Sequence, residues 1–204
     1  MDTPVTFRLG AGNARVSFSV RWFGVVFVRG SFDEVGGTVS VSASGGGSQE
    51  PSISIQVESH SVHTGISLRD RHLRGLRFLD SARHPVIRFQ SDHVTRHNGV
   101  WDVRGRLSLR GQERAVQASV SDEPLSAKDR RLTTEFNVPR HPHAIGTARG
   151  LRRLNPLLWA IGDEVTLRVE LTVPATLLHP AAEHVRARRW RNRDLGLHGG
   201  RRSV

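Results

Sequence analysis

The 204-residue chain contains no cysteine, which excludes disulfide bonds, thiolate metal sites and cysteine nucleophiles. It also lacks any stretch of about 20 consecutive apolar residues, the length that a helix needs to cross a bilayer. The first residues, 1–7, have neither the basic nor the apolar segment of a secretory signal peptide. From these absences we expect a cytoplasmic protein.

Lysine is almost absent, because Lys128 is the only one, and arginine therefore carries the net charge of +11. The forked guanidinium group suits carboxylate and phosphate, so acidic ligands, anionic lipid surfaces and nucleic acid are all possible partners. Much of the excess lies in residues 174–204, where seven arginines oppose only Glu183 and Asp194. The rest of the chain is much less basic than the total charge suggests.

The strongest pattern in what the chain does contain is alternation of apolar and polar residues. Ile53, Ile55 and Val57 alternate with polar neighbours, and the same period of two recurs along most of the chain. This period indicates antiparallel strands with one buried face. Turn signals separate the strands, and Asn98-Gly99 is the clearest hairpin turn. Many short strands joined in this way predict a sandwich or a closed barrel.

Two segments depart from the alternation. In residues 67–80 the leucines approach helical spacing, and Pro85 follows, so we predict a short helix that crosses the barrel there. After Pro174 the strand pattern ends. We therefore expect one domain over residues 1–174 and an Arg-rich, flexible tail over residues 175–204.

Several motifs follow one another in a specific order. Arg69-Asp70-x-x-Leu73, a Phe78-x-Asp80, and the strand His84-Pro85-Val86-Ile87-Arg88-Phe89 come first. A hairpin of the form V-x-G-x-L-x-x-x-G spans residues 103–111, and Gly162-Asp163-Glu164-Val165 introduces the last strand. This order resembles the YceI-like family of lipid- and polyisoprenoid-binding domains. The chain departs from the family pattern at Trp22 and in residues 140–146, which we expect at the mouth of the barrel.

The resemblance implies an all-β fold, a closed antiparallel lipocalin-like barrel of about eight strands. It also implies that the lumen binds a long-chain apolar lipid, a polyisoprenoid or an isoprenoid quinone, without catalysis and without a cofactor. Burial of an apolar tail contributes about 0.8 kcal/mol per methylene, so such a ligand needs little polar chemistry. The large apolar side chains available to line the lumen are Phe18, Val20, Trp22, Phe27, Phe32, Phe78, Phe89, Trp101, Phe136 and Trp159. A solid core built from the same residues is the alternative, since alternation alone does not distinguish the two.

Arg69 and Asp70 lie at the start of the predicted helix. We expect them to fix that helix onto the barrel, with a contact to the ligand as the alternative. Histidine pairs such as His141 and His143 raise a metal site as a hypothesis. No acidic residue near them completes a known motif, so we predict none. No Gly-x-Ser-x-Gly elbow is present, and we predict no catalytic residue.

The tail contains Trp190 within an arginine block at residues 186–193. It could dock on an anionic membrane surface, bind nucleic acid phosphates, or remain solvated without a partner. A nucleic-acid-associated protein acting through this tail is therefore an alternative function. A small enzyme on a lipocalin-like scaffold is another, because the fold alone does not decide the function.

Overall fold

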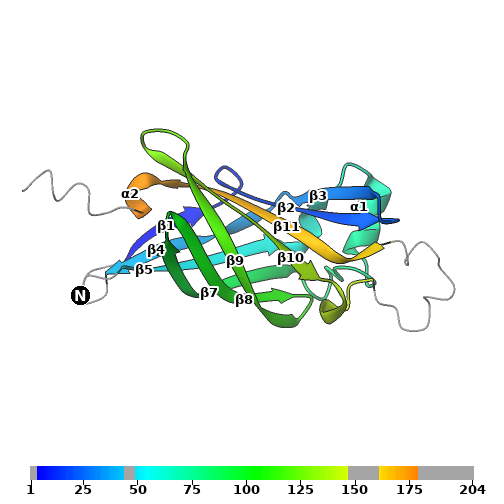
Figure 1. Cartoon of the computed structure of the whole chain (residues 1–204). Helices are drawn as coiled ribbons and strands as arrows, with labels where there is room; N and C mark the ends of the chain where they lie inside the picture. The colour runs from blue at the N-terminus through cyan, green and yellow to red at the C-terminus, as the bar shows by residue number, and fades with distance from the viewer. Residues whose placement is uncertain (1–3, 44–48, 147–160, 179–204) are drawn as a thin grey trace, which may run out of the picture.

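The computed structural model describes residues 4–43, 49–146 and 161–178. Eleven strands form a single antiparallel sheet that curls around an apolar interior (Figure 1). The strands are β1 (Val5–Leu9), β2 (Ala14–Trp22), β3 (Val26–Phe32), β4 (Val35–Ala43), β5 (Gln49–Glu58), β6 (Val62–His63), β7 (Val86–His97), β8 (Val100–Leu109), β9 (Gln112–Pro124), β10 (Asp129–Pro139) and β11 (Ile161–Pro174). The helical segments are η1 (Ser59–Ser61), α1 (Ser67–Arg74), η2 (His141–His143) and α2 (Ala175–Leu178).

The strand order is β1-β4-β5-β7-β8-β9-β10-β11-β2-β3-β6. In the described part of the chain no ladder joins β1 to β6, the two ends of this order. The ends are nevertheless linked through the chain, because β3 runs into β4 through Asp33 and Glu34. The Asp33 amide donates to the Ser61 carbonyl (3.2 Å), and the Glu58 amide donates to the Glu34 carbonyl (3.0 Å). The all-β antiparallel architecture is as predicted.

The strand count differs from the prediction, with eleven strands in place of about eight. The reason is local, because three long strands are each divided in two: residues 10–13 separate β1 from β2, a bend at Asp33 and Glu34 separates β3 from β4, and η1 separates β5 from β6. The alternation changes phase between β3 and β4, where Phe32 and Val35 are both buried, but a change of phase alone does not show whether one strand bends or two strands meet.

Tight turns set the register of the central hairpins. Asn98 and Gly99 both have positive φ (51° and 83°), as a two-residue turn between β7 and β8 requires. Arg110 and Gly111 adopt the same conformation between β8 and β9, with φ of 52° and 70°. The hairpin predicted at Asn98-Gly99 is thereby confirmed.

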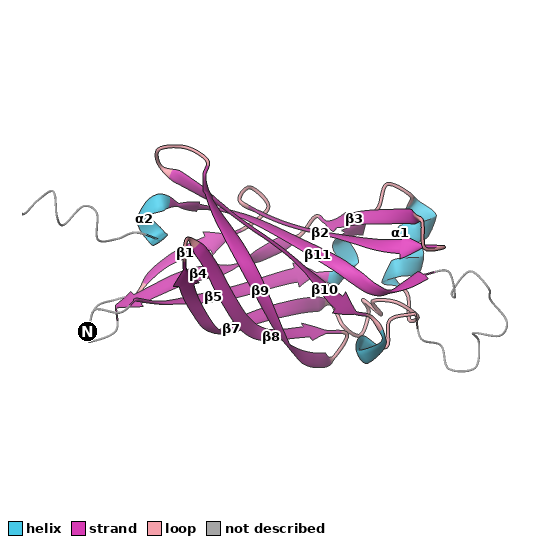
Figure 2. Cartoon of the chain, in the orientation of Figure 1, coloured by secondary structure: helices cyan, strands magenta, loops and turns pink. Residues whose placement is uncertain are grey.

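The two α-helices, α1 and α2, lie at opposite ends of the curled sheet (Figure 2). The predicted helix is present as α1 but ends at Arg74, because Gly75 has an extended backbone and the chain then continues in turns to residue 84. At the other end, Leu177 and Leu178 of α2 are buried in the core. The folded body therefore extends through Leu178, four residues past the predicted boundary. No helix among the described residues is long and apolar enough to cross a membrane.

Candidate functional site: an apolar cavity

The curled sheet encloses a cavity of about 990 Å³. Its wall consists of inward-facing aliphatic and aromatic side chains from β2, β3, β5 and β7 to β11, closed at one end by α1 and the residues after it. Ligand sites in proteins commonly measure about 300–1,000 Å³ and are largely apolar. The interior is therefore a hollow and not the solid core that alternation alone would also allow.

Seven of the ten residues predicted for the lumen line it. These residues are Phe18, Val20, Trp22, Phe32, Phe78, Phe89 and Phe136. They come from four different strands and from the turn after α1, which shows that the period-two pattern assigned the inward face of these strands correctly.

Two predicted lumen residues lie elsewhere. Phe27 is on the outer face of β3, half exposed between the guanidinium groups of Arg21 and Arg29, because its neighbour Val28 takes the inward position. Trp101 lines a separate, smaller cavity of about 340 Å³ near α2. Trp159 lies outside the described residues.

Two glycines make room for the rings that line the cavity. A Cβ on Gly30 would lie 2.5 Å from the Phe18 ring, and one on Gly105 would lie 2.8 Å from the Phe89 ring. Any side chain at these positions would displace the ring across the strand pair. Gly105 belongs to the V-x-G-x-L motif, so the glycine of that motif has a packing role here that spacing alone did not reveal.

The cavity meets solvent at the α1 end. Its exposed lining residues are Arg71, His72, Leu76 and Arg77, all in α1 or directly after it, and we call this set the mouth. Three of the four are basic side chains. The mouth therefore presents positive charge, whereas the wall behind it is apolar.

Arg69 and Asp70 fasten α1 to the sheet through a shared partner. The buried Asp70 carboxylate accepts hydrogen bonds from the Thr64 amide (2.9 Å) and from the Thr64 hydroxyl. Arg69 donates to the Thr64 hydroxyl and carbonyl, both at 2.8 Å. The two residues thus both bind Thr64, in the turn between β6 and α1.

Arg140 also lines the cavity, and sequence reasoning missed it. It is 2% exposed, and its guanidinium donates to the carbonyls of Gly162 (2.8 Å), Ile161 (3.0 Å) and Ile145 (3.1 Å) and lies 3.3 Å from the Asp163 carboxylate. These bonds tie residues 140–145 to the start of β11. The departure from the family pattern in residues 140–146 therefore falls beside the mouth, as expected.

His143 is fully buried on η2, and its Nδ1 faces the Leu109 carbonyl at 3.3 Å. Burial lowers the pKa of His143 below 6.5. Its neighbour His141 instead contacts Asp163 at 2.6 Å, so the two histidines face different partners. Across the described ranges, no group of three or more His, Asp or Glu side chains could hold a metal ion.

A curled antiparallel sheet around an apolar hollow defines the class of lipocalin-like barrels. Within that class the chain belongs to the YceI-like domain family, whose sequence model matches residues 7–173. The family expected from the sequence motifs is confirmed.

Curated relatives match about half of the chain at low sequence identity. A UPF0312 protein of Pectobacterium atrosepticum is 28% identical over 105 residues, 52% of this chain and 54% of the relative. A UPF0312 protein of Vibrio cholerae is 27% identical over 105 residues, 51% and 54% of the two chains. The match thus spans about half the length of these relatives.

Solved structures share the fold at low identity. BcnA of Burkholderia cenocepacia superposes with a TM-score of 0.65 at 17% identity, over 78% of this chain and 96% of BcnA. A polyisoprenoid binding domain from Saccharophagus degradans gives a TM-score of 0.62 at 16% identity, over 83% and 98% of the two chains. At these identities the similarity establishes the fold alone.

Proposed function

We propose that this protein binds a long-chain apolar lipid, a polyisoprenoid or an isoprenoid quinone, inside the cavity and does not transform it. The observation that carries the proposal is the hollow of about 990 Å³ lined by aliphatic and aromatic side chains. An apolar chain placed there gains from leaving water along its whole length. The family, and a structural relative described as polyisoprenoid-binding, agree with this ligand class.

The geometry also suggests an orientation. The guanidinium groups of Arg69 and Arg140 also border the cavity but are hydrogen-bonded to the protein, whereas Arg71, His72 and Arg77 surround the opening. We infer that the tail enters first and that a polar or anionic headgroup stays at the mouth. In this proposal the sheet closes as a barrel around the bound lipid, and β3 and β4 act as one bent strand.

The proposal is tested by filling the hollow. Ala118 on β9 faces the cavity, whereas Ala115 on the same strand faces solvent. Ala118→Trp should occupy the lumen, where there is room for the ring, and reduce recovery of prenyl lipid at least about tenfold. Ala115→Trp is the matched control and should load as the unmodified protein does.

The measurement is native mass spectrometry of detergent-free protein, followed by organic extraction and lipid analysis. Purified protein that carries no lipid and takes up no added prenyl lipid would overturn the proposal. Equal loading of the two tryptophan variants would place the ligand outside the cavity.

Three expectations from the sequence stay predictions. The absence of catalysis is checked by incubating the loaded protein and recovering the lipid unchanged. The cytoplasmic location is checked by cell fractionation. The arginine block at residues 186–193 lies outside the described residues, and truncation after Leu178 followed by salt-dependent binding to nucleic acid or lipid tests the roles predicted for it.

A further inference from the structure

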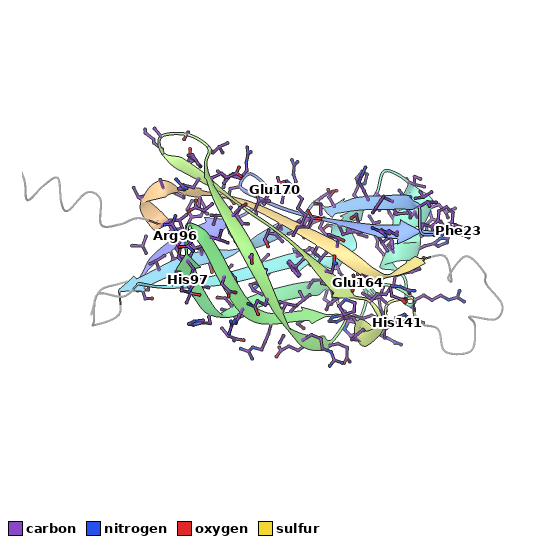
Figure 3. The ribbon with its side chains drawn as sticks, viewed as in Figure 1. Phe23, Arg96, His97, His141, Glu164 and Glu170 are labelled. Atoms are coloured by element: carbon purple, nitrogen blue, oxygen red, sulfur yellow. The ribbon has the colours of Figure 1, made fainter. Side chains whose placement is uncertain are left out.

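The tip of the β2–β3 hairpin, beside the mouth, exposes large apolar side chains. Phe23 is 60% exposed, Val25 79%, and Val26 and Phe27 each 50%. We call these four residues the hairpin tip. Figure 3 shows Phe23 at one end of the coloured strands, the end at which Figure 1 labels α1. Ile66, Leu68 and Leu76, around α1, are likewise more than half exposed.

The backbone at the hairpin tip is strained at Phe23, whose aromatic ring is exposed. Phe23 has φ of 51°, a left-handed conformation that glycine or asparagine adopts at lower cost than a bulky residue. Strained conformations of this kind concentrate at functional sites. The Phe23 ring lies 5.0 Å from the ring of Trp22, which lines the cavity. An apolar path therefore runs from the cavity wall to the outer surface.

Arginine surrounds the hairpin tip. Arg21 and Arg29 lie 5.5 Å and 5.9 Å from the Phe27 ring centroid and form no ion pair with any residue that the structure describes. Residues 66–77 add four arginines against a single acid, Asp70, which is buried. The carboxylates at the start of β11 are engaged: Asp163 contacts Arg140 and His141, and Glu164 accepts a hydrogen bond from Asn137. This end of the protein is therefore apolar at its tip and positive around it.

We propose that the hairpin tip inserts into the interface of an anionic phospholipid membrane, with Arg21 and Arg29 on the headgroups and the mouth facing the bilayer. Exposed aromatic and aliphatic side chains within a ring of cations match the interface of an anionic leaflet. A nucleic acid would use the arginines and the aromatic rings but leave the exposed Val25 and Val26 in water, which is why we favour a membrane. The role of this surface depends on the proposed function. Docking there would let an apolar ligand pass between the bilayer and the cavity without crossing water.

The test is cosedimentation of the full chain with vesicles of phosphatidylcholine alone or mixed with phosphatidylglycerol. We expect binding to the mixed vesicles that weakens as salt is raised. Phe23→Ser with Phe27→Ser should reduce the affinity at least about tenfold, because neither ring could then enter the interface. Leu125→Ser, which changes an exposed residue between β9 and β10 away from the mouth, is the matched control and should bind normally.

The charge is tested separately. Arg21→Gln with Arg29→Gln should weaken binding to the mixed vesicles by about fivefold for each arginine removed. Arg8→Gln with Arg131→Gln removes two exposed arginines elsewhere and should have little effect. Undiminished binding of both the serine and the glutamine hairpin variants, or loss of binding only on truncation after Leu178, would overturn the proposal.

The two proposals fail in different ways. Phe23, Phe27, Arg21 and Arg29 do not line the cavity, so their variants should still load prenyl lipid supplied in detergent. Vesicle binding by a protein that never carries lipid would refute the proposed ligand and leave the membrane surface standing. Lipid loading without vesicle binding would do the reverse.

Discussion

The two ends of the curled sheet are built from the same alternating strands but filled differently. At the α1 end the inward side chains leave a hollow, and the mouth opens to solvent. At the α2 end Leu177 and Leu178 pack with Val41 and Val173 into a closed core, and Arg96 and His97 mark this end in Figure 3. The α2 end holds only the smaller of the two cavities described above, of about 340 Å³, so it can supply stability that the hollow end lacks.

The charges at the two ends differ as well. At the closed end the Asp122 carboxylate is fully buried and contacts Arg130, Arg96 at 3.1 Å and the Trp101 indole nitrogen at 3.4 Å. At the mouth the arginines are exposed. Buried charge is thus paired at the closed end, whereas Arg71 and Arg77 at the mouth are exposed to a ligand or a surface.

The largest expected effect comes from breaking the charge cluster at the closed end. Asp122→Ala leaves Arg96 and Arg130 without their shared carboxylate and should cost about 3 kcal/mol of unfolding free energy. Chemical denaturation measures the loss. Asp163→Ala, which removes an exposed carboxylate near the mouth, should cost much less; equal losses would contradict the contrast between the ends.

A packing comparison should give the next largest effect. Val173→Ala in the closed core should cost about 2 kcal/mol, because Val173 is fully buried, borders neither cavity and would leave a new void. Leu167→Ala on the cavity wall should cost about 1 kcal/mol, since part of that side chain already faces empty space. Denaturation of lipid-free protein tests the difference, and a larger loss at Leu167 would contradict the assignment of the hollow to the α1 end.

A smaller effect, of opposite sign, is expected at the hairpin tip. Phe23→Asn should stabilise the fold by about 0.5–1 kcal/mol, because asparagine tolerates the left-handed backbone better than phenylalanine. Val25→Asn in the same turn, whose φ is not positive, should give no gain. A stabilised Phe23→Asn protein that binds vesicles less well would link the strain to the membrane surface.

The last effect is confined to acid conditions. Because the pKa of His143 is lowered by burial, the unfolded chain binds more protons once the pH falls below about 6.5, and stability declines there. Above about pH 6.5 neutral His143 makes its full contribution to the unfolding free energy. The unfolding free energy of His143→Asn should therefore fall less between about pH 8 and about pH 5 than that of the unmodified protein. His141→Asn is the control, and an identical pH dependence in all three proteins would contradict the role of His143.

Sequence patterns predicted the inward face of the strands well, because a period of two follows directly from the geometry of an extended chain. The patterns did not predict how far along the barrel a residue lies, or which of two neighbouring apolar residues faces inward. Phe27 follows the pattern of large apolar residues but points outward, since Val28 takes the inward position beside it. Trp101 points inward but at the closed end, and nothing in local alternation gives its distance from the mouth.

The sequence by itself determined the family, the antiparallel strands, the hairpin at Asn98-Gly99 and the presence of a helix near residue 70. These features depend on neighbouring residues, so they are written in local patterns. Only the tertiary structure decided that the interior is hollow, that α1 and α2 lie at opposite ends, and that Arg21, Arg29 and Phe23 gather at the mouth. Those features depend on which distant segments meet, and cavity volume is what remains after all the side chains have packed.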